Sequence, residues 1–248
     1  MLNKDLQDGI SIITAVKNRE QPLKYSLASW IDCPQVNQIV LIDWGCDTPL
    51  IDTLETMNIR GYPDERIVIG RCESPFWKPS HAFNLGLAYY VSNNKCLKLD
   101  ADVVIVGEEI FYLDPDNLHM NYWANSTKQN RNYLTGSFFT ATENIWAVGG
   151  YDEGFSESYG YEDDNLYDRI ESSGVERKEI PMHYLYHLPH SDAERFENYE
   201  DTVTNPDKMY ELSNSKDLNW TRNDPAKVKY THEKLSDGYY LSTPIDKK

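Results

Sequence analysis

The sequence predicts a layered α/β fold in which a mostly parallel central sheet is flanked by helices. Two observations support this. The first 105 residues alternate short apolar runs with longer amphipathic segments. Polar or charged clusters directly follow three of the apolar runs, at residues 17–19, 43–45 and 100–102. Because ligands bind at the carboxyl ends of parallel strands, we expect these three clusters to converge on one binding site.

The first half of the chain is predicted to alternate strands and helices. Strands are expected at residues 10–16, 38–43, 66–70 and 96–99. Each is a short apolar run, the pattern of a parallel strand that is buried on both faces. Helices are expected between them, at residues 22–31, 49–58 and 80–92, where apolar residues recur at helical spacing. Such strand–helix–strand units form right-handed crossovers and a parallel sheet.

The second half is less regular. We expect a strand at residues 138–140, a helix at 163–173 that ends at Gly174, and an edge strand at 175–180. From residue 191 the chain becomes polar and irregular, with a helix expected at 192–200. These features predict one domain over residues 1–190, followed by an irregular extension over residues 191–248 that wraps around it.

Charge and composition exclude several classes of protein. With 40 acidic and 24 basic residues, the net charge is −16. Proteins that bind nucleic acid or anionic lipid through phosphates need basic patches, so neither partner is expected. No apolar stretch reaches the roughly 20 residues of a membrane span, and the polar N-terminus lacks the apolar segment of a secretory signal. The 4 cysteines lack metal-site spacing, which indicates reduced thiols in a cytoplasmic protein.

Asp100 and Asp102 form the most informative pair in the chain. So acidic a sequence yields about two Asp-x-Asp patterns by chance, and a second one, Asp114 with Asp116, is typical of a turn. The first pair differs because it lies at the tip of a predicted buried strand. Carboxylates there can chelate a divalent cation that holds an anionic ligand such as a nucleotide diphosphate. The alternative is a pair that only caps a turn.

Taken in order, these segments resemble a GT-A-fold glycosyltransferase. Residues 11–19 and 38–43 resemble the first strand with its nucleotide-binding loop and the second strand, and residues 98–102 resemble the Asp-x-Asp motif. Residues 135–139 and 147–155 resemble an acceptor-side segment. Residues 160–164 are similar to the Glu-Asp-Asp segment of galactosyltransferases and N-acetylgalactosaminyltransferases. The resemblance, which extends to glycosyltransferase family 2, covers residues 10–190 and implies a Rossmann-like GT-A sheet.

The resemblance implies a donor site for a UDP-sugar and Mn²⁺, with Mg²⁺ as a weaker substitute. Asp102 is expected to bind the metal, and Asp100 to contact ribose or a metal-bound water. His187, after the last sheet strand, is the preferred further ligand, followed by His190 and then His183. The expected donor-binding residues are Thr14, Ala15, Lys17, Asn18, Arg19, Asp43, Lys78, Asn84, Asp100 and Ala101.

Asp163 is the expected general base, and Glu162 is expected to bind an acceptor hydroxyl, as the resemblance implies. Three adjacent carboxylates at residues 162–164 cannot all ionise freely, so crowding raises at least one pKa toward a useful range. Tyr161 and Gly150 are the other expected acceptor residues. The alternative is a purely structural cluster at a helix N-terminus, with Asp164 as the cap.

We therefore expect a metal-dependent inverting glycosyltransferase. Residues 1–105 would form its nucleotide-binding half and residues 106–190 its acceptor-binding half. The expected donor sugar is galactose or N-acetylgalactosamine, with glucose as a further candidate, and the expected acceptor is a saccharide or glycoconjugate. Three alternatives stay open: a retaining glycosyltransferase, a sugar nucleotidyltransferase and a non-catalytic binding module. Residues 17–19 contain no glycine, which disfavours the nucleotidyltransferase. The oligomeric state stays open.

Overall fold

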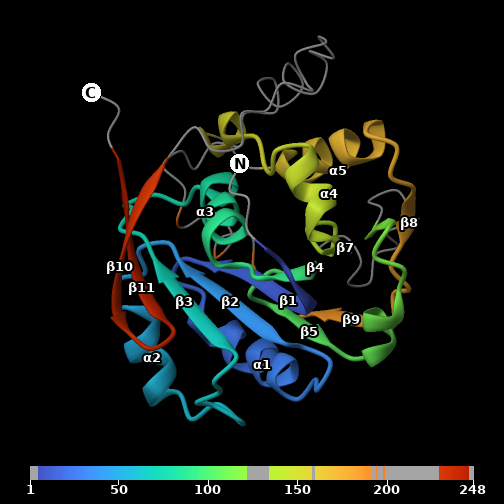
Figure 1. The fold of residues 1–248 in the computed structure, drawn as a ribbon. Helices are drawn as coiled ribbons and strands as arrows, with labels where there is room; N and C mark the ends of the chain where they lie inside the picture. Colours follow the sequence, from blue (N-terminus) through green and yellow to red (C-terminus); the bar gives the residue numbers. More distant parts are fainter. Residues whose placement is uncertain are drawn as a thin grey trace.

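The structure is a computed structural model that describes residues 5–121, 134–157, 160–191, 194, 198 and 229–245. In these residues, nine strands form one mixed sheet in the order β10-β11-β3-β2-β1-β4-β7-β6-β8 (Figure 1). Strands β5 and β9 form a second, two-stranded sheet. The predicted mostly parallel sheet with flanking helices is therefore confirmed.

The four predicted parallel strands form the centre of the large sheet. Strand β1 (Gln7–Val16) lies between β2 (Gln38–Asp43) and β4 (Asn93–Lys98), and pairs with both in parallel. Strand β3 (Ile67–Arg71) continues the parallel order on the far side of β2. The chain order reverses between β1 and β4, so the carboxyl ends of these two strands flank the switch point where such sheets bind ligands.

Antiparallel pairing begins beyond β4. Strand β7 (Phe138–Ala141) pairs with both β4 and β6 (Leu118–Met120) in antiparallel fashion. Strand β8 (Arg177–Glu179) forms the edge of the sheet, as predicted for this region. The sequence pattern does not indicate β6, a three-residue strand that is too short to show alternation.

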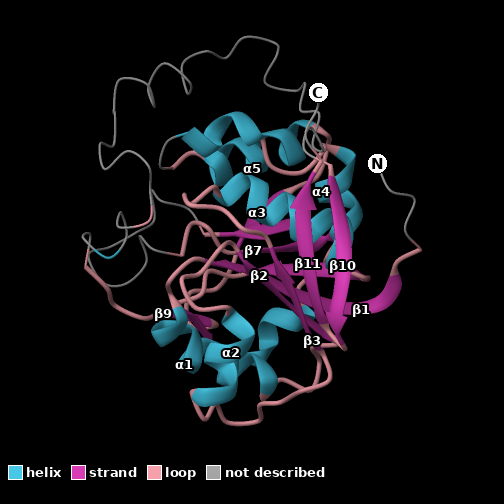
Figure 2. Cartoon of the chain, turned by 90° about the vertical axis from the view of Figure 1, so that its left-hand side faces the viewer, coloured by secondary structure: helices cyan, strands magenta, loops and turns pink. Residues whose placement is uncertain are grey.

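Helices cover both faces of the sheet (Figures 1 and 2). One face is covered by α1 (Glu20–Ile31) and α2 (Leu50–Thr56), whose apolar residues pack in one core cluster. The other face is covered by α3 (Pro79–Leu85), α4 (Thr142–Ala147) and α5 (Glu162–Ser172), which contribute to a second cluster. Short 3₁₀ segments occur at Glu108–Tyr112 and Glu153–Glu157.

The helix expected at residues 80–92 is divided. Helix α3 ends at Leu85 and continues as one π-helical turn, Gly86–Tyr90. Gly86 lies against the sheet so closely that a Cβ atom there would be 2.5 Å from Cδ1 of Ile13. Glycine therefore allows this segment to pack directly on β1, and the helix changes its hydrogen-bond pattern at the contact.

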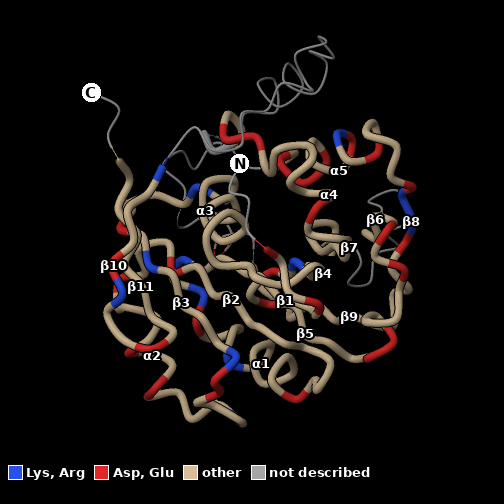
Figure 3. The backbone as a smooth tube through the Cα atoms, in the orientation of Figure 1, with Lys and Arg blue, Asp and Glu red and all other residues tan. Residues whose placement is uncertain are grey.

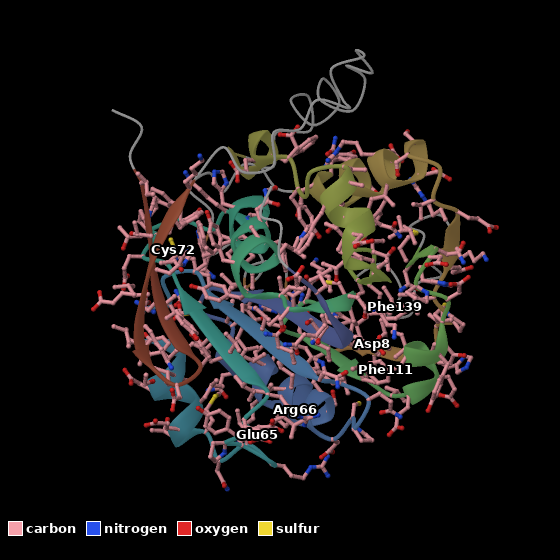
Figure 4. The ribbon with its side chains drawn as sticks, in the orientation of Figure 1. Asp8, Glu65, Arg66, Cys72, Phe111 and Phe139 are labelled. Atoms are coloured by element: carbon pink, nitrogen blue, oxygen red, sulfur yellow. The ribbon has the colours of Figure 1, made fainter. Side chains whose placement is uncertain are left out.

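Residues far apart in sequence contribute to the packing on the α1 face of the sheet. Phe111 and Phe139, labelled in Figure 4, are both buried in it. Arg66, also labelled, donates hydrogen bonds to the carbonyl oxygens of Ile31, Cys33 and Val36 and so fastens the end of α1 to the start of β3. The four cysteines are free and buried, in agreement with the expected reduced thiols.

The end of the chain differs from the irregular extension that the sequence predicts. Strands β10 (Tyr230–Ser236) and β11 (Tyr239–Pro244) form an antiparallel hairpin, and β11 pairs in parallel with β3. This segment therefore belongs to the sheet of the main domain. The helix expected at residues 192–200 and most of the rest of the extension lie outside the described residues.

Candidate active site

The loops after β1 and β4 meet at the switch point of the sheet. Arg19 follows β1, and its Nη2 donates a hydrogen bond to Oδ2 of Asp102, beyond the end of β4, over 2.7 Å. Ser26 on α1 donates to the carbonyl oxygen of Ala101 over 2.6 Å and so fixes the loop between them. The predicted convergence of residues 17–19 and 100–102 is confirmed.

Asp102 lies beside two histidines that the small sheet brings to it. Strand β5 (Val103–Ile105) pairs antiparallel with β9 (Leu185–His187), and Val103 is opposite His187. Nε2 of His187 is 3.5 Å from Oδ1 of Asp102, and Nε2 of His190 is 3.4 Å from Oδ2. Ligand atoms of the three residues all lie within 4.8 Å of one another.

This donor set fits a divalent transition-metal ion. A carboxylate and two imidazoles are ligands that suit manganese or a similar ion. Nδ1 of His190 is 3.0 Å from the carbonyl oxygen of Ser191, which can only accept a hydrogen bond. The proton of a neutral His190 therefore lies on Nδ1, and Nε2 keeps its lone pair on the side of Asp102. Both histidines lie at similar distances from Asp102. The structure therefore does not favour His187 over His190 as a metal ligand.

A second group of charges lies next to the first. Nζ of Lys98, at the end of β4, donates to Oδ1 of Asp100 over 2.8 Å and to Oδ1 of Asp163 over 3.5 Å. The hydroxyl of Tyr151 donates to the same oxygen of Asp163 over 2.8 Å. Asp100 and Asp163, which are distant in sequence, are thus joined through one ammonium group.

The start of α5 presents the predicted carboxylates. Gly160 and Tyr161 have positive φ angles of 91° and 67°, so the chain turns sharply before the first helical turn. Glu162 and Asp163 then follow at the positive end of the helix dipole. The N-terminus of α5 has no side-chain capping bond.

The surroundings of these carboxylates shift their pKa values apart. Burial raises the pKa of Glu162 to about 8, and the negative charge of Asp163 adds to the rise. Burial also raises the pKa of Asp163, to about 6, although the Lys98 ammonium opposes it. Burial acts to raise the pKa of Asp100 as well, but Lys98 more than offsets it, so that the net shift is downward. Carboxylates with such different environments can take different roles in one reaction.

Two residues expected to contact the nucleotide build the loops around the site. Asp43 is fully buried and accepts hydrogen bonds from the backbone N–H groups of Cys46 and Leu50 and from Arg71. Lys17 donates to the carbonyl oxygens of Gly45 and Ser74 over 2.7 and 2.8 Å. Both side chains thus hydrogen-bond to other groups of the protein in this structure. Their expected contact with the donor stays a prediction.

Asn84 hydrogen-bonds to the backbone of Tyr151. Its Nδ2 donates to the carbonyl oxygen of Tyr151, and its Oδ1 accepts from the backbone N–H of Tyr151, both over 2.8 Å. Asn84 therefore holds Tyr151, which in turn contacts Asp163, and its expected contact with the donor stays a prediction. Gly150, just before Tyr151, accepts a hydrogen bond from Arg169 through its carbonyl oxygen over 2.6 Å.

The remaining expected residues lie at the edges of the site. Thr14 and Ala15 are buried within β1. Asn18 has a φ of 53°, and its Nδ2 donates to Oδ1 of Asn198 over 3.0 Å. Lys78 and Tyr161 are half-buried, immediately before α3 and α5.

Sequence reasoning assigned no role to Lys98 or Tyr151. One signal was present for Lys98, since a lysine inside an apolar strand must find a buried partner. For Tyr151 there was none, because its contact with Asp163 depends on the fold of residues 147–155.

One family model matches part of this sequence. Residues 119–191 match the model of a protein family described as the N-terminal domain of galactosyltransferase. This range includes Tyr151, Asp163, His187 and His190. No curated protein matches the sequence significantly.

Several solved structures share the fold. A mutant Drosophila β1,4-galactosyltransferase 7 in complex with manganese, UDP-Gal and xylobiose superimposes with a TM-score of 0.64 and 12% identity, over 96% of this chain and 94% of that one. A mannosyltransferase from Pyrobaculum calidifontis with GDP-Man and Mn²⁺ gives 0.54 and 14%, over 73% and 59%. A 4-diphosphocytidyl-2C-methyl-D-erythritol synthase from Anaerococcus prevotii gives 0.51 and 13%, over 77% and 95%.

The chain has the GT-A fold that the sequence resemblance implies. The fold also occurs in the synthase, so the fold alone does not identify the reaction. Together with the fold, the galactosyltransferase match supports a glycosyltransferase. No helix among the described residues is long and apolar enough to cross a membrane.

Proposed function

We propose that this chain of GT-A fold is a metal-dependent, inverting glycosyltransferase that moves galactose or N-acetylgalactosamine from a UDP-sugar to a saccharide hydroxyl. One observation carries the proposal. A metal-type donor set around Asp102 lies beside a pair of linked carboxylates, Asp100 and Asp163. Glycosyl transfer needs both, because negative charge develops on the leaving diphosphate while the attacking hydroxyl loses a proton.

Asp102, His187 and His190 are the residues that would hold the ion. Mn²⁺ bound there would act as a Lewis acid toward the diphosphate. The structure of the β1,4-galactosyltransferase 7 mutant, which contains manganese and UDP-Gal, supports this choice of ion and nucleotide. Arg19, which donates to Asp102, is also placed to bind an anionic phosphate oxygen at the same edge of the sheet.

Asp163 is the proposed general base. Its Oδ1 accepts from Tyr151 and Lys98, and none of the described residues hydrogen-bonds its Oδ2. Oδ2 would take the proton of the acceptor hydroxyl as that oxygen attacks the anomeric carbon. The bond from this carbon to the diphosphate breaks at the same time, and its electron pair leaves with the nucleotide. Glu162, one residue earlier, would bind a second acceptor hydroxyl.

A panel of donors tests the proposal. The purified chain is incubated with Mn²⁺ and, in turn, UDP-galactose, UDP-N-acetylgalactosamine, UDP-glucose and GDP-mannose, with saccharide acceptors, and the product is analysed by NMR. We expect transfer from one UDP-sugar, with inversion at the anomeric carbon. A product with retained configuration contradicts the inverting mechanism, and binding of UDP-sugars without any turnover indicates a binding module.

Two aspartate variants test the metal site in the same assay. Asp102→Asn should abolish Mn²⁺-dependent UDP binding measured by calorimetry. Asp116→Asn is the matched control, because Asp116 belongs to the other Asp-x-Asp pattern and is exposed in a turn. Unchanged UDP binding in Asp102→Asn would refute the metal role.

A further inference from the structure

Lys98 is a buried lysine whose charge is used inside the protein. It is the last residue of β4, and only 3% of its side chain is exposed. Burying an ammonium group is costly unless it is paired and hydrogen-bonded. Its partners here are the Oδ1 atoms of Asp100 and Asp163, at 2.8 and 3.5 Å. One of these carboxylates belongs to the proposed donor side of the site and the other to the acceptor side.

Aromatic residues hold this ammonium group in place. Nζ of Lys98 lies 4.4 Å from the ring centroid of Phe83, a distance that favours cation–π attraction. The Phe83 ring stacks on Tyr151, with 5.3 Å between centroids. Tyr151 in turn donates its hydroxyl proton to Oδ1 of Asp163. The same carboxylate oxygen is therefore approached by two donors, which orients the Asp163 side chain.

The other oxygen of each carboxylate, Oδ2, lies beside Gly136. A Cβ atom added to Gly136 would lie 2.8 Å from Oδ2 of Asp100, 3.1 Å from Oδ2 of Asp163 and 3.0 Å from Nζ of Lys98. Glycine at this position therefore leaves room for the three groups to gather, because any side chain there would collide with them.

We propose that Lys98 is a positioning residue that ties the acceptor-side Asp163 to the donor-side Asp100 and directs Oδ2 of Asp163 toward the acceptor hydroxyl, an inference that rests on the proposed function. Lys98 does not take part in proton transfer. It holds Oδ1, so that the proton of the attacking hydroxyl can pass only to Oδ2. It also supplies the positive charge that keeps Asp163 ionised in a half-buried position.

Half of the groups that face Asp163 are carboxylates and Lys98 is the one cation among them, so Lys98 has no substitute in this set. They come from the end of β4, from the loop before the 3₁₀ segment at Glu153–Glu157, and from α5 itself. The charged and titratable groups that face Asp163 are Lys98, Asp100, Tyr151, Glu162, Asp164 and Tyr167. Without Lys98, every remaining group in this set is neutral or negative.

The pH dependence of transfer tests the proposal. In Lys98→Met, the acid limb of kcat against pH should move upward by about one to three pH units, because a nearby cation lowers a carboxyl pKa by that amount. Lys98→Arg restores a charge and should return the limb toward its original position. Lys95→Met is the matched control, since Lys95 lies on the same strand but pairs with Asp8 at the surface. Lys98→Gln replaces Lys98→Met if the methionine variant does not fold.

A measurement without substrate separates this inference from the proposed function. Carbon-13 NMR of aspartate-labelled protein, with Asp163→Asn to assign the resonance, gives the pKa of Asp163 directly. We expect the same upward shift in the neutral Lys98 variants. An unshifted Asp163 pKa, or a fall in kcat that is equal at every pH in a folded variant, overturns the role of Lys98. Absence of transfer in the unaltered chain overturns the proposed function and leaves the NMR test of Lys98 valid.

Discussion

Glu162 and Asp163 are adjacent on α5 but have different partners. Asp163 is contacted by Lys98 and Tyr151, whereas Oε2 of Glu162 has no hydrogen-bond partner among the described residues. Asp163 is therefore the better-oriented base. Glu162 has the higher pKa, about 8, so that it is protonated at neutral pH and can donate a hydrogen bond to an acceptor oxygen.

The first prediction concerns Asp163. Asp163→Asn keeps the shape of the side chain but removes the proton acceptor, so kcat should fall by about 10²- to 10⁴-fold. Mn²⁺-dependent UDP binding should be unchanged, because the donor set lies on Asp102, His187 and His190. Steady-state kinetics and calorimetry measure the two effects. A variant that keeps its full kcat would show that Asp163 is not the base.

The second prediction concerns stability at Glu162. Its pKa in the folded state, about 8, lies above its ordinary value of 4.5. The group therefore favours the folded state below about pH 4.5, and this contribution is lost as the pH rises through 8. Glu162→Gln should raise the free energy of unfolding by on the order of 1 kcal/mol at pH 9 and have little effect at pH 4.

Urea unfolding at the two pH values measures this difference. Glu65→Gln is the control, since Glu65 is exposed at the far end of the molecule (Figure 4). A gain in stability that is equal at pH 4 and pH 9 would mean that Glu162 is not desolvated as the structure indicates. Transfer activity should fall in Glu162→Gln. This result would show that Glu162 lowers the stability of the protein but is needed for transfer.

The positions of residues that stand in local sequence motifs could be predicted. Asp102 and Asp163 stand in recognisable motifs, and the structure brings both to one site. Lys98 was not predicted because its partner Asp163 is 65 residues away in the chain. The contact of Asn84 with Tyr151, 67 residues away, was not predicted for the same reason. No local pattern contains such long-range pairs.

Elements were predicted best where burial on both faces imposes a continuous apolar run. Strands β1 to β3 contain such runs and were predicted, whereas β4 begins with three polar residues and was predicted only from residue 96. Strand β10 has no such run, because Tyr230 is its only buried residue, and six exposed residues follow it. An edge strand of this kind shows no alternation of apolar and polar residues. Its place in the sheet depends on tertiary contacts that the sequence pattern does not reveal.

The third prediction concerns those contacts. The hydroxyl of Tyr90 lies 2.5 Å from Oγ of Ser242 and 3.0 Å from Nδ1 of His232, and so fastens both strands of the hairpin to the π-helical turn. Tyr90→Phe should lower the free energy of unfolding by about 1–2 kcal/mol. Hydrogen exchange at the amides of β10 and β11 should become faster, while that of β1 stays slow.

Tyr25→Phe is the control for this variant, because the side chain of Tyr25 is exposed on α1. If exchange in β10 and β11 is as slow in Tyr90→Phe as in the unaltered chain, the hairpin is held by its pairing with β3 alone. Transfer activity should change little, because the contact lies on the side of the sheet away from β4.

The whole molecule is strongly acidic, with 40 acidic and 24 basic residues. Figure 3 shows Asp and Glu positions on both sides of the sheet, among fewer Lys and Arg. Divalent cations will therefore collect weakly on many surface carboxylates. A test for the specific site must separate this general effect from binding at Asp102.

The fourth prediction makes that separation. Asp102, His187 and His190 would hold Mn²⁺, and a ligand at 100 times its Kd stabilises the folded state by about 2.7 kcal/mol. Thermal denaturation should show a rise in Tm of several degrees that Asp102→Asn removes and Asp116→Asn keeps. An equal rise in all three proteins would assign the effect to the surface.

The two carboxylates of the Asp-x-Asp pair each have a basic partner of their own. Lys98 lies 2.8 Å from Asp100, and Arg19 lies 2.7 Å from Asp102. These four residues therefore form two ion pairs and contribute no net charge to the site, although the protein as a whole carries −16. An incoming diphosphate meets paired charges in place of bare carboxylates. These four residues therefore add nothing to the repulsion that the acidic protein exerts on an approaching nucleotide.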